Sequence, residues 1–206
     1  MNPKLAEINE KIASGEAVAI DTRTAREFSR AHIPSSVSAP YNSWGWGKAV
    51  SDWLDGQNIP VILISNNSVV SEKALKELQA HKIEPLFVIS DDLKEWIEEK
   101  LPVAQLIELD PEELEKEMDQ WEIIDVREPY ELNYGMIEGA RNVPMSEVQN
   151  LVTSLDRSKK YAIVCAHGNR SEAAAMFLSD NGFHAATVVG GMANWINRSL
   201  PVVYPE

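Results

Sequence analysis

The chain aligns with itself at a fixed offset of 104 residues: the stretch AIDTRTAREFSRAHIPSSVSAP (residues 19–40) matches IIDVREPYELNYGMIEGARNVP (residues 123–144). An aspartate, an arginine, a glutamate, an isoleucine and a proline coincide in the two stretches. Matches continue in the same order further along, where the apolar run 61–64 lies over 161–164 at an offset of 100. Self-similarity that stays in order over nearly the full length of both halves predicts a duplicated domain.

The length agrees with two domains, because 206 residues suffice for two compact units of about 100 residues each. A helix signal follows the first copy, with Asp110 in the position of an N-cap and Pro111 at the first helical position. We therefore predict a boundary between residues 101 and 108, and domains at residues 1–103 and 104–206.

Within each half, short apolar runs alternate with helix-like stretches. This alternation is typical of an α/β domain with a mostly parallel β-sheet and helices on both faces. Continuous apolar runs such as 162–164 suit strands that are buried on both faces. The predicted strands are Val18–Ile20, Val61–Ile64, Leu86–Ile89, Ile123–Ile124, Tyr161–Val164 and Ala186–Val189, and the predicted helices are Glu72–Ala80, Leu93–Glu99, Pro111–Met118 and Ser171–Asp180.

The composition limits the possible partners. A formal net charge of −13 repels phosphate backbones and anionic lipid, so we expect neither nucleic-acid nor membrane-surface binding. No run approaches the roughly 20 apolar residues of a membrane span, and the polar N-terminus lacks the apolar core of a signal peptide, which predicts a cytoplasmic protein. The single cysteine, Cys165, excludes an intramolecular disulfide and a thiolate-rich metal cluster. We expect no metal and no organic cofactor.

That cysteine begins the heptapeptide Cys-Ala-His-Gly-Asn-Arg-Ser (165–171), which lies between a predicted strand and a predicted helix. Open α/β sheets bind ligands at the carboxyl ends of their strands. If the loop wraps around the Cys165 sulfur, the N–H groups of residues 166–170 point inward and the following helix adds its positive end. Gly168 permits a tight loop and Arg170 supplies a fixed charge. These features predict a Cys165 thiol that is substantially ionised at neutral pH.

A strand, Cys-x-x-Gly-x-Arg-Ser and a helix together resemble the active-site loop of rhodaneses. The stretch 125–144 is similar to the family's Asp-x-Arg…Gly-His-Ile-Pro-Gly-Ala segment, and 190–195 is similar to its closing Gly-Gly…Trp segment. Met136 and Glu138 depart from the usual His and Pro, but they lie outside the loop. The resemblance covers residues 106–204 with high specificity and 4–103 more weakly. It implies a tandem-domain rhodanese with an inactive N-terminal domain and an active C-terminal domain.

The resemblance also implies a reaction. Cys165 would attack the outer sulfur of thiosulfate or of a persulfide donor and hold that sulfur as a persulfide, with Arg170 as the second catalytic residue. A thiol, cyanide or an acceptor protein would then take the sulfur. The positions expected to contact the donor are Ala166, His167, Gly168, Asn169 and Ser171. His167 has two interpretations, a hydrogen bond to a donor sulfonate or exposure at the loop tip.

Two other functions remain open at this point. One is a non-enzymatic sulfur-relay or regulatory module that binds another protein through the same loop. The other is phosphatase or arsenate reductase chemistry of the same fold, whose loop carries one residue more between Cys and Arg than the four found here. The shorter loop makes a narrower site, which suits one sulfur atom better than a tetrahedral oxyanion.

The first half lacks both chemical elements of the loop. Ser65 stands in the position of the cysteine and Val70 in the position of the arginine, and a serine without an adjacent base is a poor nucleophile. We predict that this domain does not transfer sulfur. The acidic and basic residues common to both halves therefore fit a structural polar network better than an acid–base site; these are Asp125, Arg127 and Glu131, with Asp21, Arg23 and Glu27 as their counterparts.

Overall fold

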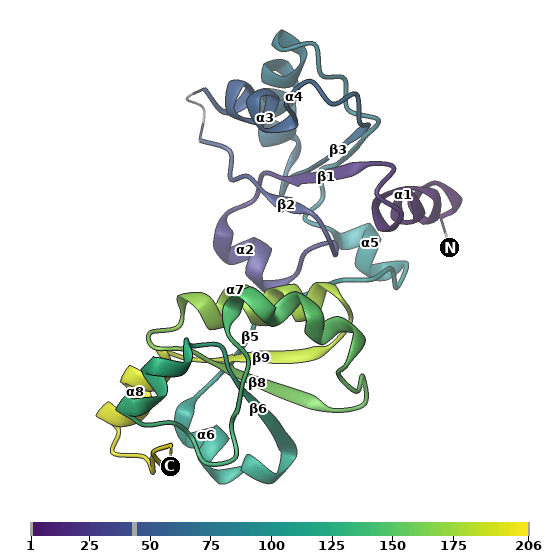
Figure 1. Cartoon of the computed structure of the whole chain (residues 1–206). Helices are drawn as coiled ribbons and strands as arrows, with labels where there is room; N and C mark the ends of the chain where they lie inside the picture. The colour runs from purple at the N-terminus through teal and green to yellow at the C-terminus, as the bar shows by residue number, and fades with distance from the viewer. Residues whose placement is uncertain (1, 43–44, 206) are drawn as a thin grey trace. The chain divides into compact units, whose positions relative to one another are not determined.

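The computed structural model describes residues 2–42 and 45–205, and the chain divides into two compact units, Met1–Ala104 and Gln105–Glu206 (Figure 1). Each unit is a parallel β-sheet between two layers of helices. The predicted α/β fold with two similar domains in tandem is confirmed.

The first unit has a four-stranded sheet in the order β2-β1-β3-β4, and all its strand pairs are parallel. Helices α1 and α5 pack against one face of the sheet, and α3 and α4 pack against the other. The strands are β1 (Val18–Asp21), β2 (Val37–Ser38), β3 (Val61–Ile64) and β4 (Phe87–Ile89), and the helices are α1 (Pro3–Ala13), α2 (Ala25–Arg30), α3 (Trp46–Leu54), α4 (Ser68–Ala80) and α5 (Lys94–Glu98).

The second unit has a five-stranded parallel sheet in the order β5-β9-β8-β6-β7. Helix α7 and the 3₁₀ segment η3 cover one face, and α6 and α8 cover the other. The strands are β5 (Ile107–Leu109), β6 (Trp121–Asp125), β7 (Arg141–Asn142), β8 (Lys160–Val164) and β9 (His184–Val188). The helical elements are α6 (Pro111–Lys116), η1 (Met118–Gln120), η2 (Pro129–Tyr134), η3 (Met145–Thr153), α7 (Asn169–Asp180) and α8 (Gly191–Asn197).

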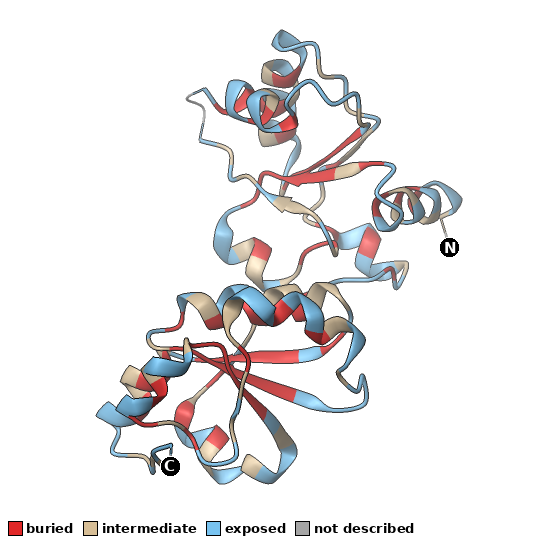
Figure 2. Cartoon of the chain, in the orientation of Figure 1, coloured by how far each residue is buried: buried red, intermediate tan, exposed pale blue. Residues whose placement is uncertain are grey.

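The continuous apolar runs form the central strands, as predicted. All four residues of β3 are buried, and so are the last four of β8, because helices cover both faces of each sheet (Figure 2). The predicted cap before α6 is also present, since the Asp110 side chain accepts a hydrogen bond from the Glu112 N–H at 2.9 Å. The two-residue strands β2 and β7 were not predicted, because runs of that length carry no periodicity.

Helices α4 and α7 begin earlier than their sequence patterns predicted. Helix α4 starts at Ser68 instead of Glu72, and α7 starts at Asn169 instead of Ser171. The first turn of each helix therefore contains the last residues of the segment that was predicted as a loop after β3 or β8. This arrangement places the positive end of each helix beside the residue that follows the strand.

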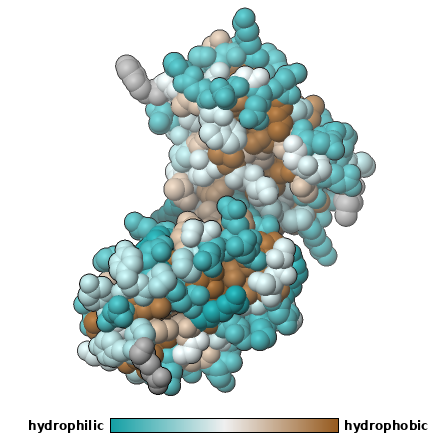
Figure 3. All heavy atoms as spheres, in the orientation of Figure 1, coloured by the Kyte–Doolittle hydropathy of each residue, from teal (hydrophilic) through white to brown (hydrophobic). Residues whose placement is uncertain are grey.

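Hydrophilic side chains cover much of the visible face of both units (Figure 3). Among residues 2–42 and 45–205, no helix is both long and apolar enough to cross a membrane.

Candidate active site

The Cys165 loop connects the central strand β8 to helix α7 at the carboxyl edge of the second sheet. Cys165 directly follows β8 and is only 1% exposed, and Gly168 is the N-cap of α7. The φ of Gly168 is +110°, a conformation that other residues rarely adopt, so glycine is required at the sharpest point of the loop. The tight loop predicted from the sequence is present.

Hydrogen-bond donors surround the Cys165 sulfur. The N–H of Gly168 donates to Sγ at 3.1 Å, and the Ser171 hydroxyl oxygen lies 3.5 Å from it. Burial raises the pKa of the Cys165 thiol. The hydroxyl and N–H of Ser171 and the N–H groups of Gly168 and His167 lower that pKa by more, so it falls below its ordinary value. The inward-pointing donors thus include Ser171, beyond the predicted range 166–170.

The position of the Ser171 hydroxyl is fixed by two further contacts. The hydroxyl donates to the Gly168 carbonyl oxygen at 2.8 Å, and its oxygen lies 2.8 Å from the hydroxyl oxygen of Thr187 on β9. All three residues are buried. These contacts consequently hold the Ser171 hydroxyl in a fixed position beside the Cys165 sulfur.

The start of α8 supports the loop from behind. The N–H of Met192 donates to the Cys165 carbonyl at 2.8 Å, and the N–H of Ala193 donates to the Ala166 carbonyl at 2.9 Å. A Cβ atom at Gly191 would overlap the Cys165 carbonyl oxygen. The Gly-Gly pair before Trp195 therefore permits a close approach of two backbone segments, and this contact fixes the floor of the loop.

Arg170 directs its guanidinium at a carboxylate and not at the sulfur. Its two terminal nitrogens donate to the two carboxylate oxygens of Glu131, each at 2.7 Å. The hydrogen bond from Arg170 lowers the pKa of Glu131 to about 2, and the same bond raises the pKa of Arg170. This pair was not predicted from the sequence, because a glutamate also occupies the equivalent position, Glu27, in the half that has Val70 instead of an arginine.

Asp125 and Arg127 form the structural network that the repeat predicted. Both side chains are buried, and Arg127 donates to both carboxylate oxygens of Asp125 at 2.6 to 3.0 Å. Arg127 also donates to the carbonyls of Glu131 and Gly135 at 3.2 and 2.9 Å. The pair thereby fixes the segment that carries Glu131, whose carboxylate then holds the Cys165 loop through Arg170.

The remaining residues of the loop form its rim. The side chains of His167 and Asn169 are exposed, and Ala166 is half-buried. No group of three or more histidine, cysteine, aspartate or glutamate side chains that could hold a metal ion occurs in the described part of the chain. The site is a single sulfur that accepts hydrogen bonds from the loop, with the side chains of Ala166, His167 and Asn169 at its rim.

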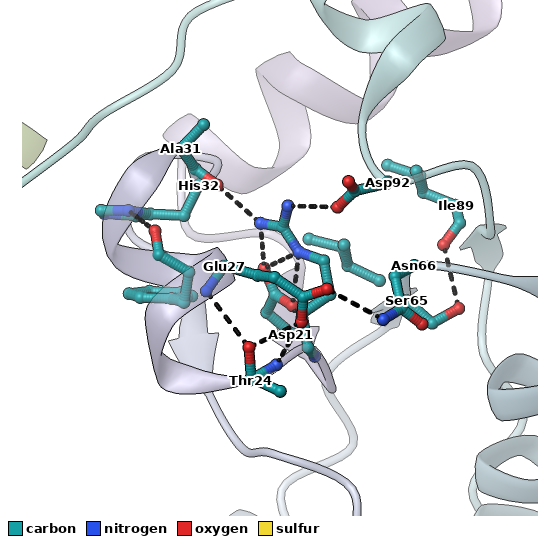
Figure 4. A network of polar contacts seen from close by, with 12 residues as sticks. Asp21, Thr24, Glu27, Ala31, His32, Ser65, Asn66, Ile89 and Asp92 are labelled. Atoms are coloured by element: carbon teal, nitrogen blue, oxygen red, sulfur yellow. Dashed lines mark hydrogen bonds and ion pairs between the residues drawn. The ribbon is translucent and has the colours of Figure 1, made fainter.

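The equivalent loop of the first unit has different contacts (Figure 4). Ser65 is buried, and its hydroxyl bonds with the Ser71 hydroxyl and with the carbonyl of Asn67. The Asn67 side chain accepts a hydrogen bond from the Val70 N–H at 3.0 Å, so this amide is satisfied within the loop. Because there is no arginine, Asn66 donates to Glu27 at 3.0 Å. The first loop is thus internally hydrogen-bonded.

Known proteins resemble both halves of the chain. A family model described as Rhodanese-like domain matches residues 4–99 and again residues 110–198. A putative sulfurtransferase, YtwF, of Bacillus subtilis is 35% identical over 79 residues, which are 38% of this chain and 77% of that protein. A sulfurtransferase of Allochromatium vinosum is 30% identical over 103 residues, 48% of this chain and 96% of that protein. The solved structure of a rhodanese-related protein from Thermoplasma volcanium is 41% identical, with a TM-score of 0.47, and covers 48% of this chain and 99% of that one.

Proposed function

Because the chain belongs to the rhodanese-like family, we propose that its second domain is a sulfurtransferase that carries sulfur as a persulfide on Cys165. The observation that supports this proposal best is the Cys165 sulfur itself, buried and surrounded by hydrogen-bond donors that lower its pKa. A thiolate in such a site is a nucleophile at neutral pH. The proposed reaction has two steps.

In the first step, the Cys165 thiolate attacks the outer sulfur of the donor. A new S–S bond forms to Cys165 while the bond between the outer sulfur and the rest of the donor breaks, and the leaving group departs with the bonding electrons. From thiosulfate the leaving group is sulfite, and from a thiol persulfide it is a thiolate. The terminal sulfur on Cys165 is then an anion, which the N–H groups of the loop stabilise.

In the second step, a thiolate or cyanide attacks the terminal sulfur of the persulfide, and the Cys165 thiolate leaves. The protein returns to its starting state with no net oxidation or reduction of its own groups. The same N–H and hydroxyl donors stabilise the Cys165 sulfur at the beginning and end of the cycle, so the loop requires little rearrangement between the steps.

Arg170 acts on the sulfur in two ways in this proposal. Its pairing with Glu131 holds the first turn of α7, and therefore the N–H of Ser171, in place. Its charge and that of the Cys165 thiolate also attract each other, which contributes to the raised pKa of Arg170. The first domain has neither a cysteine nor this arginine, and we propose that it does not transfer sulfur.

The test mixes the purified protein with a sulfur donor, thiosulfate or cysteine persulfide, and with cyanide, and follows thiocyanate. Intact mass measured without cyanide should show the gain of one sulfur atom. Cys165→Ser should abolish both signals, and the matched change Ser65→Ala in the first loop should leave both unchanged. Mass gain without turnover would favour the sulfur-relay function, and the absence of both signals with both donors would refute the proposal. Hydrolysis of p-nitrophenyl phosphate in the same preparation would favour phosphatase chemistry.

A further inference from the structure

The charges beside the Cys165 loop are mostly negative. The Glu172 carboxylate lies next to the loop, since its Oε1 would be 3.3 Å from a Cβ atom at Gly168. The Glu131 carboxylate is bound to Arg170, which belongs to the loop. With the Cys165 thiolate, these groups amount to three negative charges and one positive charge. An approaching anion therefore meets net repulsion at the loop.

The one cation at the loop is committed to a carboxylate. Both terminal nitrogens of Arg170 donate to Glu131 at 2.7 Å, so a carboxylate already balances the charge of this guanidinium. The exposed side chains of the loop, those of His167 and Asn169, carry no fixed charge. An incoming sulfonate would thus find one permanently charged cation among the side chains of the loop, Arg170, and that cation is already paired with Glu131.

The second unit as a whole is acidic, and three of its other seven basic residues are paired with carboxylates. Residues 105–206 contain 8 lysines and arginines against 17 aspartates and glutamates. Arg127 is buried against Asp125, and Arg198 pairs with Asp110. Lys159 pairs with Glu122 at the amino end of the sheet, on the edge opposite the loop. The long-range field of the unit adds to the local repulsion.

We infer that the sulfur donor of Cys165 is a thiol persulfide, and that Glu172 and the neutralised Arg170 make the dianion thiosulfate a poor substrate. This inference rests on the proposed function. The amide groups of the loop bind the transferred sulfur atom, which both donors share. The difference lies in the leaving group, because thiosulfate brings a charged sulfonate into an acidic entrance, whereas a thiol persulfide brings a carbon chain.

The chemistry balances for such a donor, R–S–SH. The Cys165 thiolate attacks the outer sulfur, a new S–S bond forms, and R–S⁻ leaves with the electrons of the broken S–S bond. The proton on the transferred sulfur passes to R–S⁻, giving R–SH and an anionic persulfide on Cys165. One thiol is released for each sulfur transferred, and no external oxidant or reductant takes part.

The test compares kcat/KM for thiosulfate and for cysteine persulfide at pH of about 8, where an unperturbed imidazole is neutral, with cyanide as acceptor. We expect the persulfide to be the better donor by tenfold or more. The value for thiosulfate should rise about threefold between about 10 and about 300 mM NaCl, because salt screens repulsion between like charges. If the loop attracted thiosulfate, its kcat/KM would fall with increasing salt instead.

Two variants that each remove one carboxylate charge, one beside the loop and one far from it, show whether the repulsion comes from the loop. Glu172→Gln should raise kcat/KM for thiosulfate about threefold and reduce its salt dependence. Glu122→Gln, at the opposite edge of the sheet, should change neither. If thiosulfate is the better donor and its kcat/KM falls with salt, the inference is wrong while the proposed function stands. If neither donor adds sulfur to Cys165, the proposed function itself fails.

Discussion

Replacing Asp125 by asparagine removes the negative charge beside a buried guanidinium while keeping the shape of the side chain. In the structure Asp125 is fully buried and Arg127 is 3% exposed. Arg127 Nη2 donates to Asp125 Oδ2 at 2.6 Å, so the amide NH₂ of an asparagine would place one donor against another. The remaining partners of Arg127 are the neutral carbonyls of Glu131 and Gly135.

The expected loss in the free energy of unfolding is about 3 kcal/mol or more, the usual cost of leaving a buried charge without its partner. For a domain of about 100 residues this corresponds to a decrease in Tm of roughly 12 °C or more. The carboxylate of Glu131 does not compensate, because it is already bound to Arg170.

The first unit supplies a matched control. Asp21 and Arg23 form the same buried pair, but Arg23 also donates to the Asp92 carboxylate at 2.9 Å (Figure 4). Asp21→Asn therefore leaves Arg23 with one carboxylate, which is 45% exposed. We expect a loss of about 1 to 2 kcal/mol for this variant, smaller than for Asp125→Asn.

Hydrogen exchange followed by mass spectrometry reads the two units separately. Asp125→Asn should lower the protection of the slowest amides of β6 and β8 about 100-fold, because each 1.4 kcal/mol is a factor of ten. Asp21→Asn should lower the protection of β1 and β3 about tenfold. Adding Arg127→Met to Asp125→Asn should restore part of the loss by removing the unpaired charge. Equal losses in the two units, or a loss below about 1 kcal/mol for Asp125→Asn, would refute the reasoning.

Three further predictions concern the loop and its support. Ser171→Ala should raise the pKa of the Cys165 thiol, seen as a shift of the iodoacetamide reaction to higher pH, whereas Ser71→Ala should have no effect on that profile. Gly191→Ala should displace the loop and reduce persulfide formation at least about tenfold. Gly139 has a similar positive φ but no atom within 4 Å of an added Cβ, so Gly139→Ala should cause only a small loss of stability. Equal effects of the two variants on persulfide formation would exclude the steric argument. The pKa of Glu131 is lowered to about 2, so its contribution to stability is complete above about pH 4.5 and is lost as the pH falls toward 2. Urea unfolding of Glu131→Gln at several pH values should lack this acid-dependent loss. Parallel plots of unfolding free energy against pH for the two proteins would contradict the prediction.

The sequence was sufficient for the parts of the fold that depend on local patterns. The apolar runs at 61–64 and 161–164 are long enough to mark buried strands, and Asp110 with Pro111 marks a helix start through backbone chemistry alone. The two-residue strands β2 and β7 depend on pairing with β1 and β6, which a local pattern does not contain.

For the site, the sequence identified the loop but not its supports. The partners Glu131 and Arg170 are 39 positions apart, and only the fold brings them together. The same is true of Thr187, which positions the Ser171 hydroxyl from a neighbouring strand. The sequence predicted Arg170 as a fixed charge and as the second catalytic residue of the loop. The structure shows that the partner is Glu131, which changes the expected charge at the entrance and hence the expected donor.

The two loops of the chain differ in the groups that accept hydrogen bonds from their backbone amides. Both loops follow a buried strand and precede a helix, and each has a serine six positions after its first residue, Ser71 and Ser171. In the first loop the side chain of Asn67 satisfies an N–H of the first turn of α4. In the second loop the Cys165 sulfur accepts a hydrogen bond from the N–H of Gly168 at 3.1 Å, where an anionic sulfur would be stabilised. The fold is common to both units, and the sulfur site that we propose depends on Cys165, which only the second loop has.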